Sequence, residues 1–359
     1  GKSKPVQAFY VVRERETKVA DLAAFFEGQG VPFLGRQDEL DLLIDSLETV
    51  ASLEMAHVVK VAGALGSGKS RLVTEFSRRA TDDHQARIIY GRSTRSINIF
   101  MAPVRQGLES YLTTAFGSVR EGIHQLLGST TMAVASAESI SGAGLELLDS
   151  FFAGNEMFHN SGESTQAIRK TLFWSLGHLL QAIAGDKMCV LVLADAHLAD
   201  ESLQEFVEYL LGDGGAKVRT LLCWEMQTNA ETLEGAKSLF EHPRVGMLEM
   251  KALDDASISK MVQDILAPVG EVPAWVVEWI VAQAEGRPLY VLEHLRSLKA
   301  LNLLAIDAEL GTWEIVAQKP NDMVLPPTIH GALQAELDSM NPIQRILLQR
   351  AAVVGRVFW

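Results

Sequence analysis

The stretch "VAGALGSGKSRL", residues 61–72, decides which fold this chain is expected to adopt. Gly63 is followed by four residues and then by Gly-Lys-Ser, which is the spacing of a loop that binds nucleotide phosphates. In such a loop, the glycines let backbone N–H groups surround phosphate oxygens at the positive end of the following helix. Lys69 would reach the β- and γ-phosphates, and the Ser70 hydroxyl would hold Mg²⁺. The residues expected to bind nucleotide here are Gly63, Gly66, Ser67, Gly68, Lys69, Ser70 and Arg71.

The flanking sequence separates a phosphate loop from a chance glycine-rich turn. The β-branched run "HVVKVA", residues 57–62, leads directly into the loop, and "SRLVTEFSRRA", residues 70–80, reads as an amphipathic helix. A strand before the glycines and a helix after them form the context in which this motif binds phosphate. We therefore favour nucleotide binding over a fortuitous match.

The sequence around the loop predicts an α/β domain. The run "MCVLVLAD", residues 188–195, is apolar almost throughout, as expected for a strand buried on both faces of a parallel sheet. Alternation of strands and helices over 57–250 predicts a doubly wound parallel sheet of the P-loop NTPase type. Residues 99–160 are expected to form amphipathic helical pieces with a flexible insertion around 128–145. The other candidate elements are strands at 87–93 and 218–225 and helices at 164–184 and 201–212.

A helical region is expected to follow the α/β domain. Three helical patterns lie at 254–266, 273–286 and 288–302. The segment "LLAIDAELGTWEIV", residues 303–316, reads as a hairpin that turns near Gly311. The chain is therefore expected to contain at least two domains, in keeping with its 359 residues.

A phosphate loop needs a carboxylate at the end of a neighbouring buried strand, where it holds Mg²⁺ through water. Asp195 follows the apolar run 188–194 and is the candidate for this metal site and for catalysis. Two adjacent acids are usual at this point, one for Mg²⁺ and one to polarise the attacking water, but Ala194 stands at the first position. The alternative is an ordinary buried strand with a polar exit. His197 could sense the γ-phosphate, although a single loop histidine is more often structural.

Composition narrows the class of protein and its partners. The formal net charge of −13 argues against a general nucleic-acid surface, and we expect no membrane span or signal peptide. The two cysteines, Cys189 and Cys223, both lie in apolar runs, so buried reduced thiols are favoured over a disulfide or metal site. Reduced thiols suit a cytoplasmic location. Both ends of the chain read as if cut from a larger protein.

The order of motifs resembles one family. The segments "PFLGRQDELDLL" (32–43), "GALGSGKSRLVTEF" (63–76), "LVLADAHLADESL" (191–203) and "AEGRPLYVLEHLRSL" (284–298) occur in the order found in signal-transducing ATPases with numerous domains, the STAND class. The resemblance is greatest to regulators whose ATPase module follows a class III adenylyl or guanylyl cyclase domain. The N-terminal "GKSKPVQAFYVV" resembles the last strand of such a cyclase domain. The segment from 325 to 358 resembles the beginning of a winged-helix region.

The resemblance implies a domain division and further site residues. It implies the tail of an upstream cyclase-like domain at 1–28, a nucleotide-binding domain at 29–250, a helical lid with a hairpin at 251–318, and the start of a winged-helix region at 319–359. Phe33, Gly35 and Arg36 would line the adenine and ribose side, and Gly286 and Pro288 would bring the helical domain onto the nucleotide. The plainer interpretations are a loop before a helix and a helix-breaking turn. The implied ligands are ATP or ADP with Mg²⁺, and the implied partners are the cyclase upstream and the winged-helix region and helical repeats downstream.

Departures from the family pattern bear on hydrolysis. The family usually has an acid at the position of Ala194, and often an arginine that senses the γ-phosphate where this chain has Glu225. Loss of such groups removes stabilisation of the transferred phosphoryl charge, whereas the loop backbone and Lys69 would still bind nucleotide.

Three functions are compatible with the motifs of the whole chain to different degrees. An ATP- or ADP-dependent regulatory switch with weak or absent hydrolysis is favoured, because differential affinity for two states needs no turnover. An active AAA+-type ATPase that remodels protein or nucleic acid would need complete catalytic groups, which Ala194 disfavours. A vestigial scaffold that binds no nucleotide is disfavoured by the intact loop. Cyclase catalysis would lie upstream of residue 1.

Overall fold

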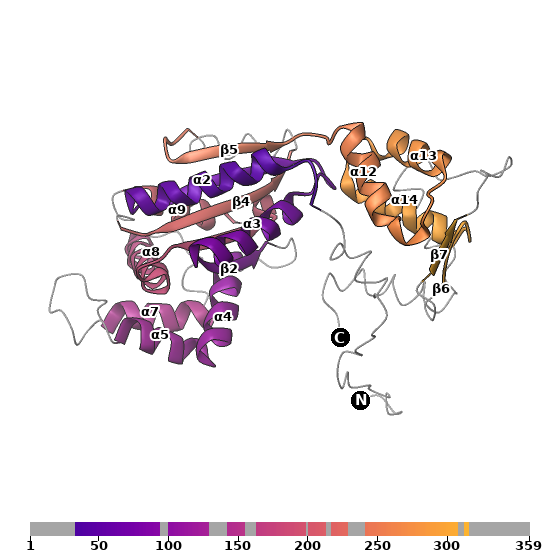
Figure 1. The fold of residues 1–359 in the computed structure, drawn as a ribbon. Helices are drawn as coiled ribbons and strands as arrows, with labels where there is room; N and C mark the ends of the chain where they lie inside the picture. The colour runs from indigo at the N-terminus through magenta and orange to yellow at the C-terminus, as the bar shows by residue number, and fades with distance from the viewer. Residues whose placement is uncertain are drawn as a thin grey trace, which may run out of the picture. The chain divides into compact units, whose positions relative to one another are not determined.

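The structure is a computed structural model that describes residues 33–93, 100–128, 142–154, 163–198, 200–212, 217–228, 241–307 and 312–315. The described residues fall into two compact units, one up to Leu253 and one from Asp254 onward, and each is treated by itself (Figure 1). The predicted cyclase-like tail, the centre of the predicted insertion, the turn at Gly311 and the predicted winged-helix region lie outside the described residues.

The first unit is built on a parallel sheet of five strands, ordered β2-β3-β4-β1-β5. The strands predicted around 57–62, 87–93, 188–195 and 218–225 are confirmed. The edge strand β5 was not predicted, because its sequence "VGMLEM" leaves both Gly246 and Met247 exposed and so lacks a recognisable pattern. The strands are β1 His57–Gly63, β2 Arg87–Arg92, β3 Cys189–Ala194, β4 Thr220–Gln227 and β5 Val245–Met250.

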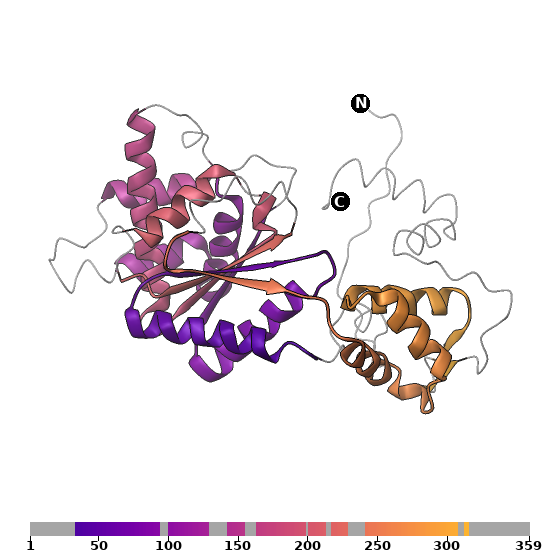
Figure 2. The same ribbon diagram turned by 90° about the horizontal axis from the view of Figure 1, so that it is seen from above.

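Helices cover both faces of the sheet, which makes it doubly wound as predicted (Figure 2). The side chains of α2 and α3 pack on one face, and those of α4, α5, α7, α8 and α9 belong to the core on the other. Successive residues of a strand point to opposite faces, so β3 contributes Val190 and Val192 to the α2/α3 side and Leu191 and Leu193 to the other. The helices are α2 Gln37–Leu53, α3 Lys69–His84, α4 Ala102–Phe116, α5 Val119–Gly128, α7 Gly142–Phe152, α8 Glu163–Ala184 and α9 Glu201–Leu211.

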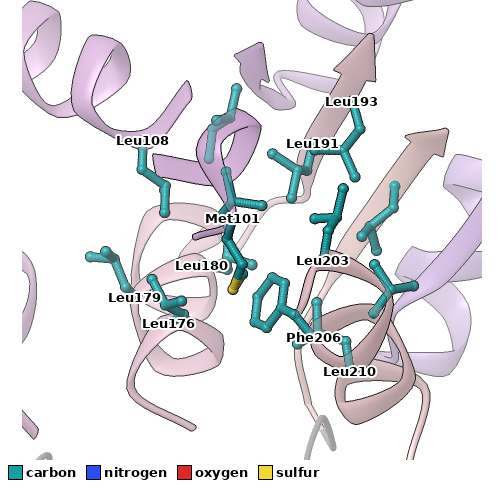
Figure 3. Packing of buried hydrophobic residues seen from close by; sticks show 14 of the residues in the cluster. Met101, Leu108, Leu176, Leu179, Leu180, Leu191, Leu193, Leu203, Phe206 and Leu210 are labelled. Carbon is teal, nitrogen blue, oxygen red and sulfur yellow. The ribbon is translucent and has the colours of Figure 1, made fainter. Parts of the chain in front are cut away.

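The larger core explains why the apolar run at 188–194 forms a central strand. Leu191 and Leu193 of β3 face leucines of α8 and α9 and the ring of Phe206, with Met101 closing the cluster from the start of α4 (Figure 3). Each of these side chains is fully buried. Burial of one leucine contributes about 1.5–3 kcal/mol, so this cluster fixes the strand whose end carries Asp195.

The described part of the second unit consists of helices followed by an antiparallel pair of strands, as predicted. Helices α12 and α14 each pack against α13, and α14 leads into the antiparallel pair β6–β7 (Figure 1). Asp254 caps α12 by accepting a hydrogen bond from the backbone N–H of Ser257 at 2.7 Å. The elements are α12 Asp255–Ile265, α13 Ala274–Ala284, α14 Pro288–Ala300, β6 Leu304–Asp307 and β7 Thr312–Ile315.

Both cysteines are free thiols in the sheet, as expected, and both are fully buried. Burial raises the pKa of Cys189 to about 12 and also raises the pKa of Cys223. Across the described ranges, every helix is too short or too polar to cross a bilayer.

Candidate nucleotide-binding site

The predicted phosphate loop connects the end of β1 to the start of α3. Gly66 and Gly68 have φ angles of 79° and 92°, which is the left-handed region where a side chain would be strained. Gly63 is needed for a different reason, since a Cβ there would come within 2.7 Å of both Met250 Cβ and Ser67 Oγ. The loop is thus shaped by its glycines, and α3 begins at Lys69 directly after it.

Lys69 folds back onto the loop that precedes it. Its Nζ donates hydrogen bonds to the carbonyl oxygens of Gly63 at 2.8 Å and Ala64 at 3.0 Å. Burial lowers the pKa of Lys69, and the negative charges of Glu225 and Asp195 act in the opposite direction. The ammonium group is therefore held at the mouth of the loop, where a phosphate oxygen could accept a bond from it. Arg71 lies in the same first turn of α3 and is half-buried.

The segment before α2 packs against the loop rather than standing apart from it. The buried Arg36 side chain donates from Nη2 to the carbonyl of Ser67 at 3.3 Å and to that of Lys251 at 2.5 Å. Gly35 turns the chain with a φ of 63°, and Phe33 packs against the core on the α2/α3 face. Arg36 is thus bonded to loop backbone. That these residues line the adenine and ribose side stays a prediction.

Ser70 meets a carboxylate from the middle of the sheet. Its Oγ donates a hydrogen bond of 3.0 Å to Oε2 of Glu225 on β4. Glu225 is only 3% exposed, and its other oxygen, Oε1, has no hydrogen-bond partner in the part of the chain that the structure describes. Burial raises the pKa of this carboxyl, and the hydrogen bond from Ser70 partly offsets that effect. The hydroxyl predicted to bind Mg²⁺ therefore lies beside an acid.

Asp195 follows β3 in the left-handed region, with a φ of 52°. Its Oδ2 accepts a bond of 2.8 Å from Nε of Arg92, the last residue of β2. Ala194, immediately before it, is fully buried. The acid predicted to serve the metal and catalysis thus forms an ion pair across the ends of two strands. Its catalytic and metal roles stay predictions.

Three other predicted residues lie apart from the loop in sequence. His197 is in the short 3₁₀ helix Ala196–Leu198 and is half-buried, and its role as a γ-phosphate sensor is not tested. Gly286, with a φ of 67°, and Pro288, at the start of α14, form the turn between α13 and α14 in the second unit. Arg287 between them donates to the hydroxyl of Tyr290 at 2.8 Å. A proline is well suited to the first position of a helix, so this turn is explained by the start of α14. Its contact with nucleotide stays a prediction.

Glu225 is a functional candidate that the sequence does not single out. The family pattern marks it only as a position where an arginine is usual, whereas the structure shows that its carboxylate accepts a hydrogen bond from Ser70. One signal could have revealed it, because Glu225 interrupts the apolar strand "TLLCWEM" of a sheet that is buried on both faces. A buried acid in such a strand needs a partner, and partners of that kind gather at functional sites.

The donor set suits a magnesium nucleotide. The loop offers backbone N–H groups and the Lys69 ammonium to phosphate oxygens, and the carboxyl ends of the strands offer oxygen ligands. Mg²⁺ prefers oxygen ligands and keeps several waters. The unpartnered Oε1 of Glu225 is a buried acceptor of the kind that such a water satisfies.

A parallel sheet in which an inner strand enters a helix through this loop defines the class of P-loop NTPases. The family described as AAA ATPase domain matches residues 32–223, more than half of the 359 residues. The chain belongs to the AAA ATPase domain family. No curated protein matches it in sequence.

Solved structures give matches at low sequence identity. The ORC2 protein of Aeropyrum pernix, in ADPNP–ADP complexes, matches with a TM-score of 0.48 and 13% identity, covering 89% of this chain and 74% of that chain. Cdc6p of Pyrobaculum aerophilum matches with a TM-score of 0.47 and 16% identity, covering 79% and 66% respectively. AMPPCP-bound DnaA of Aquifex aeolicus matches with a TM-score of 0.40 and 12% identity, covering 75% and 62%. These likenesses concern the fold alone.

Proposed function

We propose that this chain is a nucleotide-dependent regulatory switch that binds ATP or ADP with Mg²⁺ and hydrolyses ATP slowly. The observation that carries the proposal is the loop geometry, which places the Lys69 ammonium on the carbonyls of Gly63 and Ala64 and the Ser70 hydroxyl beside a carboxylate. Backbone N–H groups at the start of α3 would bind phosphate oxygens, and Lys69 would neutralise their charge. The Ser70 hydroxyl would help to hold Mg²⁺, which would offset the charge of the phosphates.

The ion pair of Asp195 with Arg92 supports slow turnover. A carboxylate that polarises water must be free to accept the proton of that water. Arg92 donates to Oδ2 of Asp195 at 2.8 Å, so this oxygen is already engaged in an ion pair. Since phosphoryl transfer depends on positioning and charge stabilisation, a water that is not activated lowers the rate without removing binding.

The wider setting of the switch is also part of the proposal. The STAND-like order of motifs supports a regulator with a cyclase domain before this module and winged-helix and helical-repeat regions after it. The division at 29–250, 251–318 and 319–359 belongs to this proposal, as does a cytoplasmic location. Bound nucleotide would then stabilise one state of the regulator, by the difference in affinity between two states.

Nucleotide analysis of the purified chain tests the switch. Denaturation and chromatography should release close to one adenine nucleotide per chain from the wild type and much less from Lys69→Ala. Lys260→Ala, which removes an exposed lysine of α12 in the other unit, is the matched control and should retain the wild-type content. A wild-type chain that carries no nucleotide and does not bind added ATP would contradict the proposal.

A second candidate is an active AAA+-type ATPase that remodels a protein or nucleic-acid partner. The hydrogen bond from Ser70 to Glu225 favours it, because it supplies an acid at the expected magnesium position. The net charge of −13 favours a protein partner, although the Aeropyrum pernix ORC1 protein, a match in fold, was solved in complex with DNA. Phosphate release that rises steeply when duplex DNA or a partner is added would favour this candidate over the switch.

A further inference from the structure

We propose that Glu225 on β4 supplies the magnesium-side carboxylate of this site, in place of the acid that is absent at Ala194 on β3. The assignment rests on the proposed nucleotide function and identifies the residue through which the metal would be held. Glu225 would then supply a carboxylate on the neighbouring strand, at a position where the sequence pattern shows only that an arginine is missing.

The strand register places Ala194 and Glu225 side by side. Strands β3 and β4 pair in parallel up to Leu193 and Trp224, so that Ala194 and Glu225 are the next residues on neighbouring strands. Neighbouring strands lie about 4.8 Å apart. A carboxylate at Glu225 is therefore displaced by one strand spacing from the position where a β3 acid would stand.

The two positions also share a face of the sheet. Val192 and Cys223 pack in the core on the α2/α3 side, and Ala194 and Glu225 each follow by two residues. Side chains two residues apart in a strand point to the same face. Both positions thus face α3, the helix whose first turn carries Ser70, and the contact of 3.0 Å between Ser70 Oγ and Glu225 Oε2 shows that the β4 carboxylate reaches it.

Burial indicates that this carboxylate has a purpose beyond packing. Glu225 is 3% exposed, one of its oxygens is bonded to Ser70, and Oε1 has no hydrogen-bond partner among the described residues. Burial of an oxygen without a partner is unfavourable, and a metal-bound water would satisfy it. Asp195 is less suited to this position, because its carboxylate is bonded to Arg92.

The small side chain of Ala194 is consistent with a carboxylate on β4 in place of one on β3. If an aspartate stood there, two carboxylates would face α3 from adjacent strands, and their mutual repulsion would disfavour ionisation of both. Ala194 is fully buried and adds no carboxylate beside Glu225 on this face.

Magnesium dependence of nucleotide affinity tests the assignment without any measurement of turnover. ATP is titrated in Mg²⁺ and in EDTA against wild type, Glu225→Gln, Ala194→Asp/Glu225→Gln and the control Glu249→Gln, which changes an exposed glutamate of β5. Glutamine keeps the shape of Glu225 and an acceptor for Ser70. Electron paramagnetic resonance of Mn²⁺ counts the metal ions bound with ATP in each variant.

The expected result is specific to the metal. Glu225→Gln should lower the Mg²⁺ enhancement of ATP affinity by about tenfold or more, as the loss of a group behind a metal ligand does. Its affinity in EDTA should be unchanged or tighter, because a negative charge near the phosphates is removed. Glu249→Gln should behave as wild type, and Ala194→Asp/Glu225→Gln should recover most of the enhancement.

Two outcomes would overturn the assignment. One is a Glu225→Gln chain that keeps the full Mg²⁺ enhancement and binds Mn²⁺ with ATP as wild type does. The other is a folded double variant no better than Glu225→Gln, which would show that the positions are not equivalent. Failure of the proposed function gives a different result, because the wild type itself would then bind no ATP.

Discussion

The two halves of the candidate site are built in different ways. The phosphate loop consists of consecutive residues, Gly63 to Ser70, and its backbone conformation depends on its glycines. The acidic half is assembled from the ends of β2, β3 and β4, which contribute Arg92, Asp195 and Glu225 from distant parts of the chain. In the proposed site, the loop would bind phosphate through its shape, whereas the strand ends would act through side-chain charge.

The two halves of the site should therefore tolerate different substitutions. A side chain can change at the strand ends without moving the backbone, so the charge arrangement can shift from one strand to the next and still face α3. The loop has no such freedom, because its glycines occupy left-handed conformations or tight contacts. Binding and hydrolysis should therefore respond separately to mutation, and the predictions below test that separation.

The largest effect is expected from Gly63→Ala. The new Cβ would lie 2.7 Å from both Met250 Cβ and Ser67 Oγ, so that β5 or the loop must shift. Overpacking of this kind lowers the free energy of unfolding by roughly 1–3 kcal/mol, and ATP affinity should fall with it. Thermal melts and ATP titration measure both. The control is Gly142→Ala at the start of α7, where a Cβ meets nothing within 4 Å and stability should not fall.

Lys69→Ala should separate binding from folding. The substitution removes the ammonium group from the loop carbonyls and from the phosphates, so ATP affinity should fall at least tenfold, which is about 1.4 kcal/mol. The melting temperature without nucleotide should change little. Equal affinities of wild type and Lys69→Ala in a labelled-ATP titration would refute the assignment of the loop.

Glu225→Gln should raise the stability of the chain without nucleotide. Burial raises the pKa of Glu225, which means that its ionised form is disfavoured in the folded state at neutral pH. Removing that charge should increase the free energy of unfolding by about 1 kcal/mol in urea denaturation. Asp195→Asn should act in the opposite direction, by about 0.2–1 kcal/mol, because it removes an ion pair at the surface. The same sign for both substitutions would contradict the contrast drawn between the two acids.

The smallest effect is expected in the second unit and depends on pH. His294 is fully buried beside Trp279, and burial lowers its pKa below the ordinary 6.5. A lowered histidine pKa leaves stability complete above about pH 6.5 and reduces it as pH falls toward the folded-state pKa. Between pH 7.5 and 5.5, wild type should therefore lose about 0.5 kcal/mol more than His294→Gln.

Much of the fold could be predicted because its signals are local. The glycine spacing at 63–70, the apolar run at 188–194 and the helical patterns after 253 each lie within one stretch of sequence, and the structure has the corresponding elements. The edge strand β5 was missed because one of its faces is exposed and its pattern is irregular.

The acidic half of the site could not be predicted in the same way. The bond between Ser70 and Glu225 joins residues 155 positions apart, and that between Arg92 and Asp195 joins residues 103 apart. Such contacts follow from strand order, which places β4 between β3 and β1, and strand order is not encoded in any single stretch. The motif at the end of β3 therefore indicates that an acid is missing at Ala194, but it gives no information about Glu225 on the neighbouring strand.

Phosphate release by the wild-type chain is the most direct test of the central claim, that this site binds magnesium ATP but turns it over slowly. The release of phosphate should be followed at saturating ATP over a wide range of protein concentration, so that an arginine supplied by a neighbouring chain would appear as a rise in specific rate. We predict a rate below about 0.01 s⁻¹ at every concentration, the range of phosphate-loop NTPases without added activation. A dilute chain that hydrolyses ATP at about 1 s⁻¹ or faster would contradict the account.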